Sequence, residues 1–390
     1  MEDSATDIRT FSRIVGVGVS RADNADDAMR EAVAALPDAG ICFALVFVPE
    51  RLEPEAVAAA LTRHLPTTLA FGCTTAGQIT PAGYENDALL IVTFPRDHFR
   101  CSSALIHPLR PVSIAATATR ARQMATRFQK TAGWNRFALV IADGLSKQED
   151  VLVAALEAGL DDMPVFGGSA GGGMAFRSTF VLHGGSFRSN AAVMILLETD
   201  LEFSGIGFHH FLPTQQRMVV TEALPDERVV LELNGSPAAE EYARQIGCEV
   251  CDLSPRVFAE NPMLVRSHTA WHVRAIQQVT GNGGLSFLCA IDDGLILTLG
   301  QSRQILETLE RGLCVRGPDG PHPDLILGFD CFLRKLEIEQ NGIVPQASDL
   351  LHRYGVLGFN TFGEQHCGVH VNQTFVGVAL FAPKGKPHAD

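Results

Sequence analysis

Short apolar runs alternate with amphipathic segments along most of the chain, and the same order of segments occurs twice. Residues 41–111 read as an apolar strand, a helix, the segment FGCTTAG and further apolar strands. Residues 137–213 repeat this order, with FGGSAG at the corresponding place. Short apolar runs bounded by glycine and polar residues are typical of buried strands. The pattern therefore predicts a duplicated α/β unit.

The pattern changes near residue 222, where the duplicated order stops. The later segments predict a helix at 237–246, another at 302–313, and strands at 263–266, 273–277, 285–290, 295–298, 325–332, 356–359 and 374–381. We therefore expect two domains, residues 13–222 with the duplicated unit and residues 223–384 with fewer helices. Strands outnumber helices, which predicts an α/β protein of mixed sheets flanked by helices. A ligand is expected at the seam between the domains.

Composition and charge exclude several classes of partner. The net charge is −13 and the pI is near 5.4, which argues against nucleic acid or an anionic membrane as a partner. No apolar run approaches the roughly 18 residues that cross a bilayer, and the first residues are acidic and polar. Nine scattered cysteines fit reduced thiols. These features predict a cytoplasmic protein.

A glycine-rich segment contains one candidate for nucleophilic chemistry. Gly167-Gly168-Ser169-Ala170-Gly171 matches G-x-S-x-G, the nucleophile elbow of α/β-hydrolases, but a strand rather than a helix is expected after it. The first copy has Cys73-Thr74-Thr75 at the equivalent place. Backbone N–H groups in such turns also bind ligands. We favour ligand binding by Cys73, Gly168 and Ser169 and keep a hydrolase using Ser169 or Cys73 as an alternative.

Five segments, spread over nearly the whole chain, carry a resemblance to a known family. They are FGCTTAGQI (71–79), VFGGSAGGG (165–173), VVLELNGSPAAEEY (229–242), GFDCFLRK (328–335) and GFNTFGEQ with HVNQT (358–374). With these segments the chain resembles FIST proteins, a bacterial family with paired N- and C-terminal sensory domains. The last two segments are similar to the branch described as nitric-oxide-sensing.

The resemblance implies an intracellular ligand sensor that is not an enzyme. In the nitric-oxide-sensing branch it implies haem as cofactor, with regulation of a separate histidine kinase or cyclic-di-nucleotide enzyme. The sequence shows no kinase or cyclic-di-nucleotide enzyme segment of its own. A signal would therefore pass to another protein.

The matching segments also suggest site residues. The family motifs cover Cys331, Arg334, Glu364, His370 and Asn372, and polar residues of this kind are hard to explain by packing alone. His370 is the first candidate for an axial haem ligand, with an ordinary hydrogen-bonded histidine as the alternative. His210 is the second candidate metal ligand. It belongs to a doublet whose members point to opposite faces of a strand.

A second interpretation dispenses with haem. Arg334, Glu364, Asn372 and Gln373 form a polar set that suits an amino acid better than a porphyrin. A FIST protein that senses an amino acid or a similar metabolite therefore stays open beside the haem hypothesis.

Overall fold

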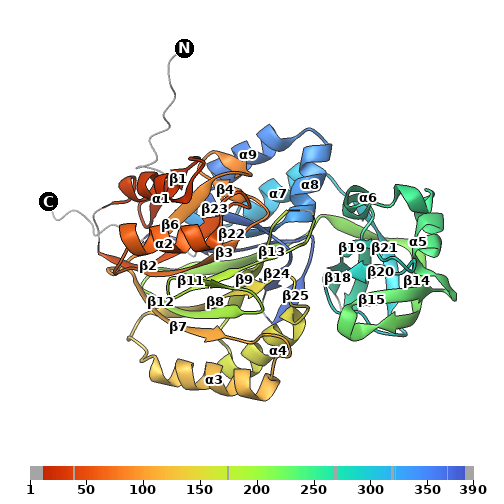
Figure 1. The fold of residues 1–390 in the computed structure, drawn as a ribbon, viewed down its shortest axis with the longest axis horizontal. Coiled ribbons are helices and arrows are strands. Elements are labelled where there is room, and N and C mark those ends of the chain that lie inside the picture. Colours follow the sequence, from red (N-terminus) through yellow and green to blue (C-terminus); the bar gives the residue numbers. More distant parts are fainter. Residues whose placement is uncertain are drawn as a thin grey trace, which may run out of the picture.

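A computed structural model describes residues 12–37, 40–173, 175–267, 270–317, 320, 322–366 and 368–382. A large body holds three six-stranded sheets flanked by helices, and a smaller lobe lies beside it, on the right in Figure 1. The predicted α/β class of mixed sheets is confirmed.

The body is built from three repeats rather than two. The first comprises β1 (Gly16–Ser20), α1 (Ala25–Ala34), β2 (Ile41–Val48), α2 (Pro54–His64), β3 (Leu69–Thr74), β4 (Gln78–Thr80), β5 (Gly83–Glu85) and β6 (Leu89–Pro95). Both of its helices begin at residue types that favour a helix start. The Asn24 side chain accepts a hydrogen bond from the N–H of Asp27 at the start of α1, and Pro54 opens α2.

The second repeat follows the same order. It comprises β7 (Phe99–Ile106), α3 (Ile114–Arg127), β8 (Asn135–Asp143), α4 (Glu149–Leu160), β9 (Val165–Ala170), β10 (Val181–His183), β11 (Ser186–Arg188) and β12 (Ala192–Thr199). Its helices α3 and α4 take the places that α1 and α2 have in the first repeat. Together these two repeats confirm the predicted duplication.

A third repeat was not expected from the sequence. It comprises β13 (Phe203–Phe208), α7 (Ile305–Leu313), β22 (Leu325–Cys331), α8 (Phe332–Gln340), α9 (Val344–Arg353), β23 (Val356–Thr361), β24 (Glu364–His366), β25 (Val369–Val371) and β26 (Phe375–Leu380). The strand predicted at 325–332 ends at Cys331, and α8 begins at once. The first seven residues of α8 are all buried, so they lack the amphipathic period that marks a helix.

The three sheets share one strand order, and each is completed by a hairpin from another repeat. The orders are β1-β6-β2-β3, β7-β12-β8-β9 and β13-β26-β22-β23, with β2–β3, β8–β9 and β22–β23 parallel. The hairpin β10–β11 extends the first sheet, β24–β25 the second and β4–β5 the third. Each repeat thus contributes one hairpin to the sheet of another repeat, and these strand pairings hold the three repeats together.

One glycine in each repeat allows two backbones to approach. A Cβ atom on Gly72, Gly167 or Gly358 would lie 1.9, 1.9 or 1.8 Å from the carbonyl oxygen of its partner on the neighbouring parallel strand. No side chain fits in that space. The Phe-Gly pairs at 71–72 and 166–167 therefore mark a packing requirement of the repeat.

The ends of β3, β9 and β23 meet at a central junction of the body. Equivalent backbone groups form a ring of hydrogen bonds there. The carbonyls of Thr74, Ser169 and Asn360 accept from the amides of Gly171, Phe362 and Ala76, at 2.9, 3.2 and 3.1 Å. The two segments quoted for the duplication are thus two of three equivalent corners, and residues 358–363 supply the third.

The lobe is an insertion between β13 and α7. It contains β14 (Phe211–Leu224), β15 (Val229–Leu233), β16 (Ser236–Pro237), α5 (Ala238–Ile246), α6 (Pro255–Glu260), β17 (Met263–Ser267), β18 (Ala270–Arg274), β19 (Ile276–Val279), β20 (Leu285–Phe287) and β21 (Ile296–Ser302), with short 3₁₀ turns at 225–227 and 250–252. Its sheet packs against α5 and α6 around its own core, which includes Met218, Tyr242, Phe258 and Leu297.

An apolar cluster joins the lobe to the body. Phe211, Leu264, Val273 and Leu288 come from the lobe, and Phe332, Leu333, Leu336 and Phe362 come from the body. Strands on both sides of residue 222 share two of the body's sheets, as β13 with β26 and β9 with β24 show. The boundary between residues 13–222 and 223–384 stays a prediction.

Candidate functional site

Four of the residues that sequence analysis singled out lie along the seam between lobe and body: Ser169, His370, Asn372 and Gln373. The hairpin β24–β25 forms the body side of this seam. In the hairpin, Gln365 lies opposite His370, so both side chains occupy one face. Ser169 comes from β9, which pairs with β24. The exchange of hairpins between repeats thus brings residues 169 and 365–370 together.

A chain of hydrogen bonds runs along this face. The Gln365 Nε2 lies 2.8 Å from Ser169 Oγ and 3.3 Å from His370 Nδ1. The His370 Nε2 lies 3.3 Å from the carbonyl oxygen of Leu288 in the lobe. Because a carbonyl only accepts, Nε2 carries the proton and Nδ1 accepts from Gln365. His370 is 2% exposed and connects the lobe to the body.

Glu364 lies on the opposite face of the same hairpin. Its carboxyl group accepts hydrogen bonds from the hydroxyl of Thr361 and from the N–H and hydroxyl of Thr374, the last two at 3.2 and 2.6 Å. Burial raises the pKa of Glu364 to about 8, against the opposing effect of these donors. Glu364 therefore anchors the hairpin to the body interior.

Arg334 and His210 belong to a separate network at the neck of the lobe. Arg334 Nε donates to Asp330 Oδ1 at 2.7 Å, and Arg334 Nη1 lies 2.8 Å from His210 Nδ1. The His210 Nε2 lies 2.7 Å from Glu337, which also accepts from Ser302 at 2.7 Å. His210 precedes β14 and Ser302 ends β21. Hydrogen bonds therefore join α8 to both chain segments that connect the lobe with the body.

Burial sets the protonation state of His210. It lowers the pKa of His210 to about 4, although the hydrogen bond to Glu337 acts in the opposite direction. The neutral ring then accepts from Arg334 at Nδ1 and donates to Glu337 at Nε2. Both nitrogens are engaged, which makes His210 a structural member of the neck.

The two predicted cysteines lie apart from the seam face. Cys73 sits in the interior of β3 within the main core cluster, and Cys331 ends β22 at the start of α8. Burial raises the pKa of both thiols well above the ordinary value. A buried thiol of this kind is a poor nucleophile and a poor metal ligand because each role needs the thiolate.

Ser169 lies within a strand and not at an exposed turn. Its hydroxyl is buried and lies beside the amide of Gln365. Its N–H donates to the carbonyl of Gly363, and its own carbonyl accepts from the N–H of Phe362. A nucleophile elbow holds its serine at a sharp strand-to-helix turn. Gly168 packs closely against Thr361 and Phe359, as one corner of the junction.

Several buried polar atoms at the seam find no hydrogen-bond partner among the described residues. On the body side these are acceptors: Gln365 Oε1, Asn372 Oδ1 and Gln373 Oε1. The amides of Asn372 and Gln373 face the carbonyls of Phe362 and Ala259, at 3.5 and 2.8 Å. These two contacts fix the amide orientation, so the side-chain oxygens point elsewhere.

On the lobe side the unpartnered atoms are donors. Arg274 Nε and Nη1 are buried and have no hydrogen-bond partner within the described part of the chain. Arg274 ends β18, which lies beside β25. Burial raises the pKa of Cys289, the residue after Leu288, to about 11, and the positive charge of Arg274 acts in the opposite direction. Arg274 therefore lies near the Leu288 segment. Sequence analysis missed Arg274 because a single arginine in a strand carries no motif.

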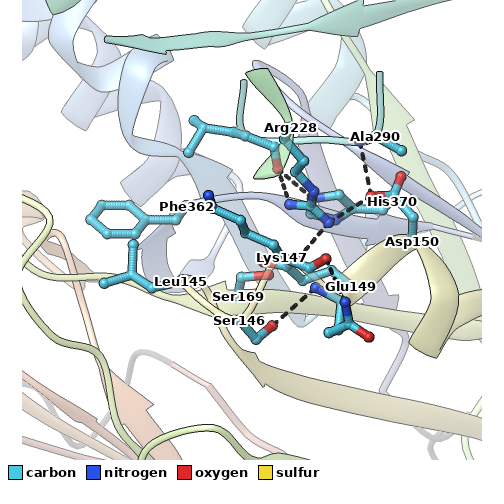
Figure 2. A network of polar contacts seen from close by, with 12 residues as sticks. Leu145, Ser146, Lys147, Glu149, Asp150, Ser169, Arg228, Ala290, Phe362 and His370 are labelled. Carbon is cyan, nitrogen blue, oxygen red and sulfur yellow. Dashed lines mark hydrogen bonds and ion pairs between the residues drawn. The ribbon is translucent and has the colours of Figure 1, made fainter. Parts of the chain in front are cut away.

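A buried ion-pair network closes the seam next to these groups. Figure 2 shows Arg228 of the lobe between Glu149 and Asp150, the first residues of α4, with both contacts at 2.7 Å. The Arg228 Nη1 also donates to the carbonyl of Leu288 at 2.7 Å, and the N–H of Ala290 donates to Asp150 at 3.1 Å. Burial acts to lower the pKa of Arg228, but Glu149 and Asp150 outweigh it and raise that pKa.

Both histidines considered as haem ligands are engaged by protein groups in this conformation. In His370 and in His210 both ring nitrogens take part, and both rings are buried. Within the described ranges, no three His, Cys, Asp or Glu side chains gather as a metal site. A surface cavity of about 630 Å³ beside β1 is lined by Arg13, Pro37 and His98 and contains none of the predicted residues.

A lobe closed over a buried polar seam, on a body of three repeats, describes a small-ligand-binding module more closely than a catalytic cleft. The model of the FIST N domain matches residues 42–236, and that of the FIST C domain matches residues 238–367. The chain therefore belongs to the FIST family, whose domains are signal-transduction sensory domains that bind small ligands. No curated protein is found to match the chain. Among the described residues, no helix is long and apolar enough to cross a membrane.

Proposed function

We propose that this chain is a signal-input protein that binds a small zwitterion, an amino acid or a close relative, at the seam. The output would pass to a separate histidine kinase or cyclic-di-nucleotide enzyme, as the family resemblance implies. The observation that carries the proposal is that unpartnered buried donors on Arg274 and unpartnered buried acceptors on Asn372 and Gln373 belong to the two sides of the seam, where β18 contacts β25.

An amino acid has the matching groups. Its carboxylate accepts the paired N–H bonds that a guanidinium offers, and its ammonium donates to amide oxygens. Leaving one buried polar group without a partner costs about 1–3 kcal/mol. A ligand that satisfies both sides would therefore stabilise the closed lobe, and differential affinity for the closed state is what a sensor needs.

The seam is closed in this conformation. His370, Asn372 and Gln373 are all buried, and the ion pairs of Arg228 lie beside them. A ligand would therefore enter when the lobe moves away from the body and would be enclosed when it returns. Hinge closure of this kind is common in ligand-binding proteins.

The test is a thermal-shift screen of the full chain against the common amino acids, followed by titration calorimetry. We expect saturable binding of one ligand class, weakened at least about tenfold by Arg274→Gln or Asn372→Ala. Arg63→Gln, an exposed change in α2, is the matched control and should bind as the wild type does. Absence of any shift, or equal binding by all variants, would contradict the proposal.

Haem and nitric oxide stay a prediction from the family resemblance. They require His370 to exchange the carbonyl of Leu288 for an iron atom, which means opening the seam. The measurement is the absorption spectrum with stoichiometric haem, before and after reduction and addition of nitric oxide. A saturable band that responds to nitric oxide and is lost in His370→Ala would establish haem in place of the zwitterion.

A further inference from the structure

One face of the lobe sheet exposes apolar side chains to solvent. Val219 on β14 and Ile296 on β21 are 39% and 55% exposed and lie opposite each other in the antiparallel ladder. Arg217 and Thr298 form another opposed pair two residues along. Side chains two residues apart share a face of the sheet, so these four lie on one face.

This face is hollowed into a groove of about 390 Å³. The groove extends over Arg217, Ile296 and Thr298 to Arg266 on β17 and Trp271 on β18. Arg266 lies opposite Trp271, and β18 is the edge strand of the sheet. The groove therefore combines an aromatic ring, the exposed aliphatic side chain of Ile296 and two guanidinium groups near the edge strand of the sheet.

The charge of the groove is opposite to that of the whole chain. Among the residues that the structure describes, Arg217 and Arg266 are the charged residues that line it, on a chain with a net charge of −13. Neither guanidinium forms an ion pair with a residue that the structure describes. Asp292 and Asp293 lie in the turn before Gly294 and are not among the residues that line the groove.

We propose that this groove docks an extended, acidic segment of a partner protein. Apolar side chains of the segment would cover Val219 and Ile296, and its carboxylates would pair with Arg217 and Arg266. Extended segments bind in this way at sheet edges and in side-chain pockets. Bidentate pairing with carboxylates is the geometry that arginine favours.

The same charges argue against two other occupants. A symmetric pair of copies would bring the same two arginines toward each other, because a twofold interface uses one patch on both chains. An anionic membrane would be repelled by the chain as a whole at a net charge of −13. A short acidic segment, unlike a membrane surface, contacts only the groove and its two arginines.

Trp271 connects the groove with the seam. Its side chain packs against the apolar cluster between lobe and body, and its carbonyl oxygen lies 3.1 Å from His209 Nε2 at the neck. A movement of the lobe would therefore change the groove. This coupling rests on the proposed function, whereas docking itself does not.

The test uses two fluorescent peptides, one alternating glutamate with leucine and one alternating lysine with leucine. In fluorescence anisotropy with the full chain, we expect the glutamate peptide to bind saturably and more tightly at low salt. The double variant Arg217→Glu, Arg266→Glu should weaken this binding at least about tenfold. The matched control, Arg120→Glu with Arg127→Glu on the exposed side of α3, should leave it unchanged.

Other outcomes would overturn the proposal. These are no binding of the glutamate peptide at millimolar concentration, equal binding of the lysine peptide, and equal weakening by both double variants. Sedimentation that shows a dimer lost on changing Arg217 and Arg266 would assign the groove to a second copy. Co-sedimentation with phosphatidylserine vesicles that the same change abolishes would assign it to a membrane.

Discussion

Glu364 and Gln365 are neighbours in the chain but have different roles, because successive strand residues point to opposite faces. Gln365 faces the seam and orders Ser169 and His370, whereas Glu364 faces the body interior and binds Thr361 and Thr374. A motif that spans both residues therefore contains one group suited to ligand binding and one that holds the hairpin.

The raised pKa of Glu364 predicts a dependence of stability on pH. With a pKa of about 8, the folded chain keeps a proton that the unfolded chain releases near pH 4.3. The unfolded state binds fewer protons in this window, so the free energy of unfolding should fall as pH rises from about 5 to about 8. In Glu364→Gln that contribution is absent, and urea denaturation at several pH values should show a flatter profile. Parallel profiles of the two proteins would refute this assignment.

At the scale of elements, the repeat depends on close approach of parallel strands at three glycines. Gly72→Ala, Gly167→Ala and Gly358→Ala each place a Cβ atom against a backbone carbonyl that cannot move without breaking the sheet. We expect each change to destabilise the fold by about 3 kcal/mol or more, measured by chemical denaturation. Gly281→Ala is the matched control, since nothing lies within 4 Å of its Cβ position. Equal stability of the core variants and this control would contradict the account.

The sequence predicted most of the elements and two of the three repeats. Apolar runs predicted the strands that correspond to β22, β23 and β26, and the helices predicted at 237–246 and 302–313 correspond to α5 and α7. The third repeat escaped prediction because the lobe separates β13 from α7 and because α8 is buried on all sides. Helical periodicity cannot be seen in a helix without a solvent face.

The site was only partly predictable for a different reason. Gln365, His370, Asn372 and Gln373 lie close together in sequence, and all but Gln365 were singled out within the segments that resemble FIST proteins. Arg228 and Arg274 come from the lobe, and Glu149 comes from the second repeat. Only the exchange of hairpins and the closure of the lobe bring them to the seam. No local pattern carries that information.

At the scale of the whole molecule, the lobe is held by the neck and by the buried ion pairs of Arg228. Arg228→Met would leave Glu149 buried without its partner, and breaking such a pair costs about 3–5 kcal/mol. We expect lower stability together with a larger radius of gyration in small-angle scattering, because the seam opens. Arg353→Met removes a pair with Glu310 that is exposed on both sides and should change neither. An unchanged radius in Arg228→Met would show that this bridge does not hold the seam closed.

The central claim is that the small ligand binds between the hairpin β24–β25 and the lobe. Amide hydrogen exchange, with and without the amino acid that gives the largest thermal shift, tests it most directly. The account predicts slower exchange on both sides of the seam, in residues 364–371 and in residues 285–291. Slower exchange confined to the first two repeats, or to the surface cavity beside β1, would place the ligand elsewhere and contradict the account.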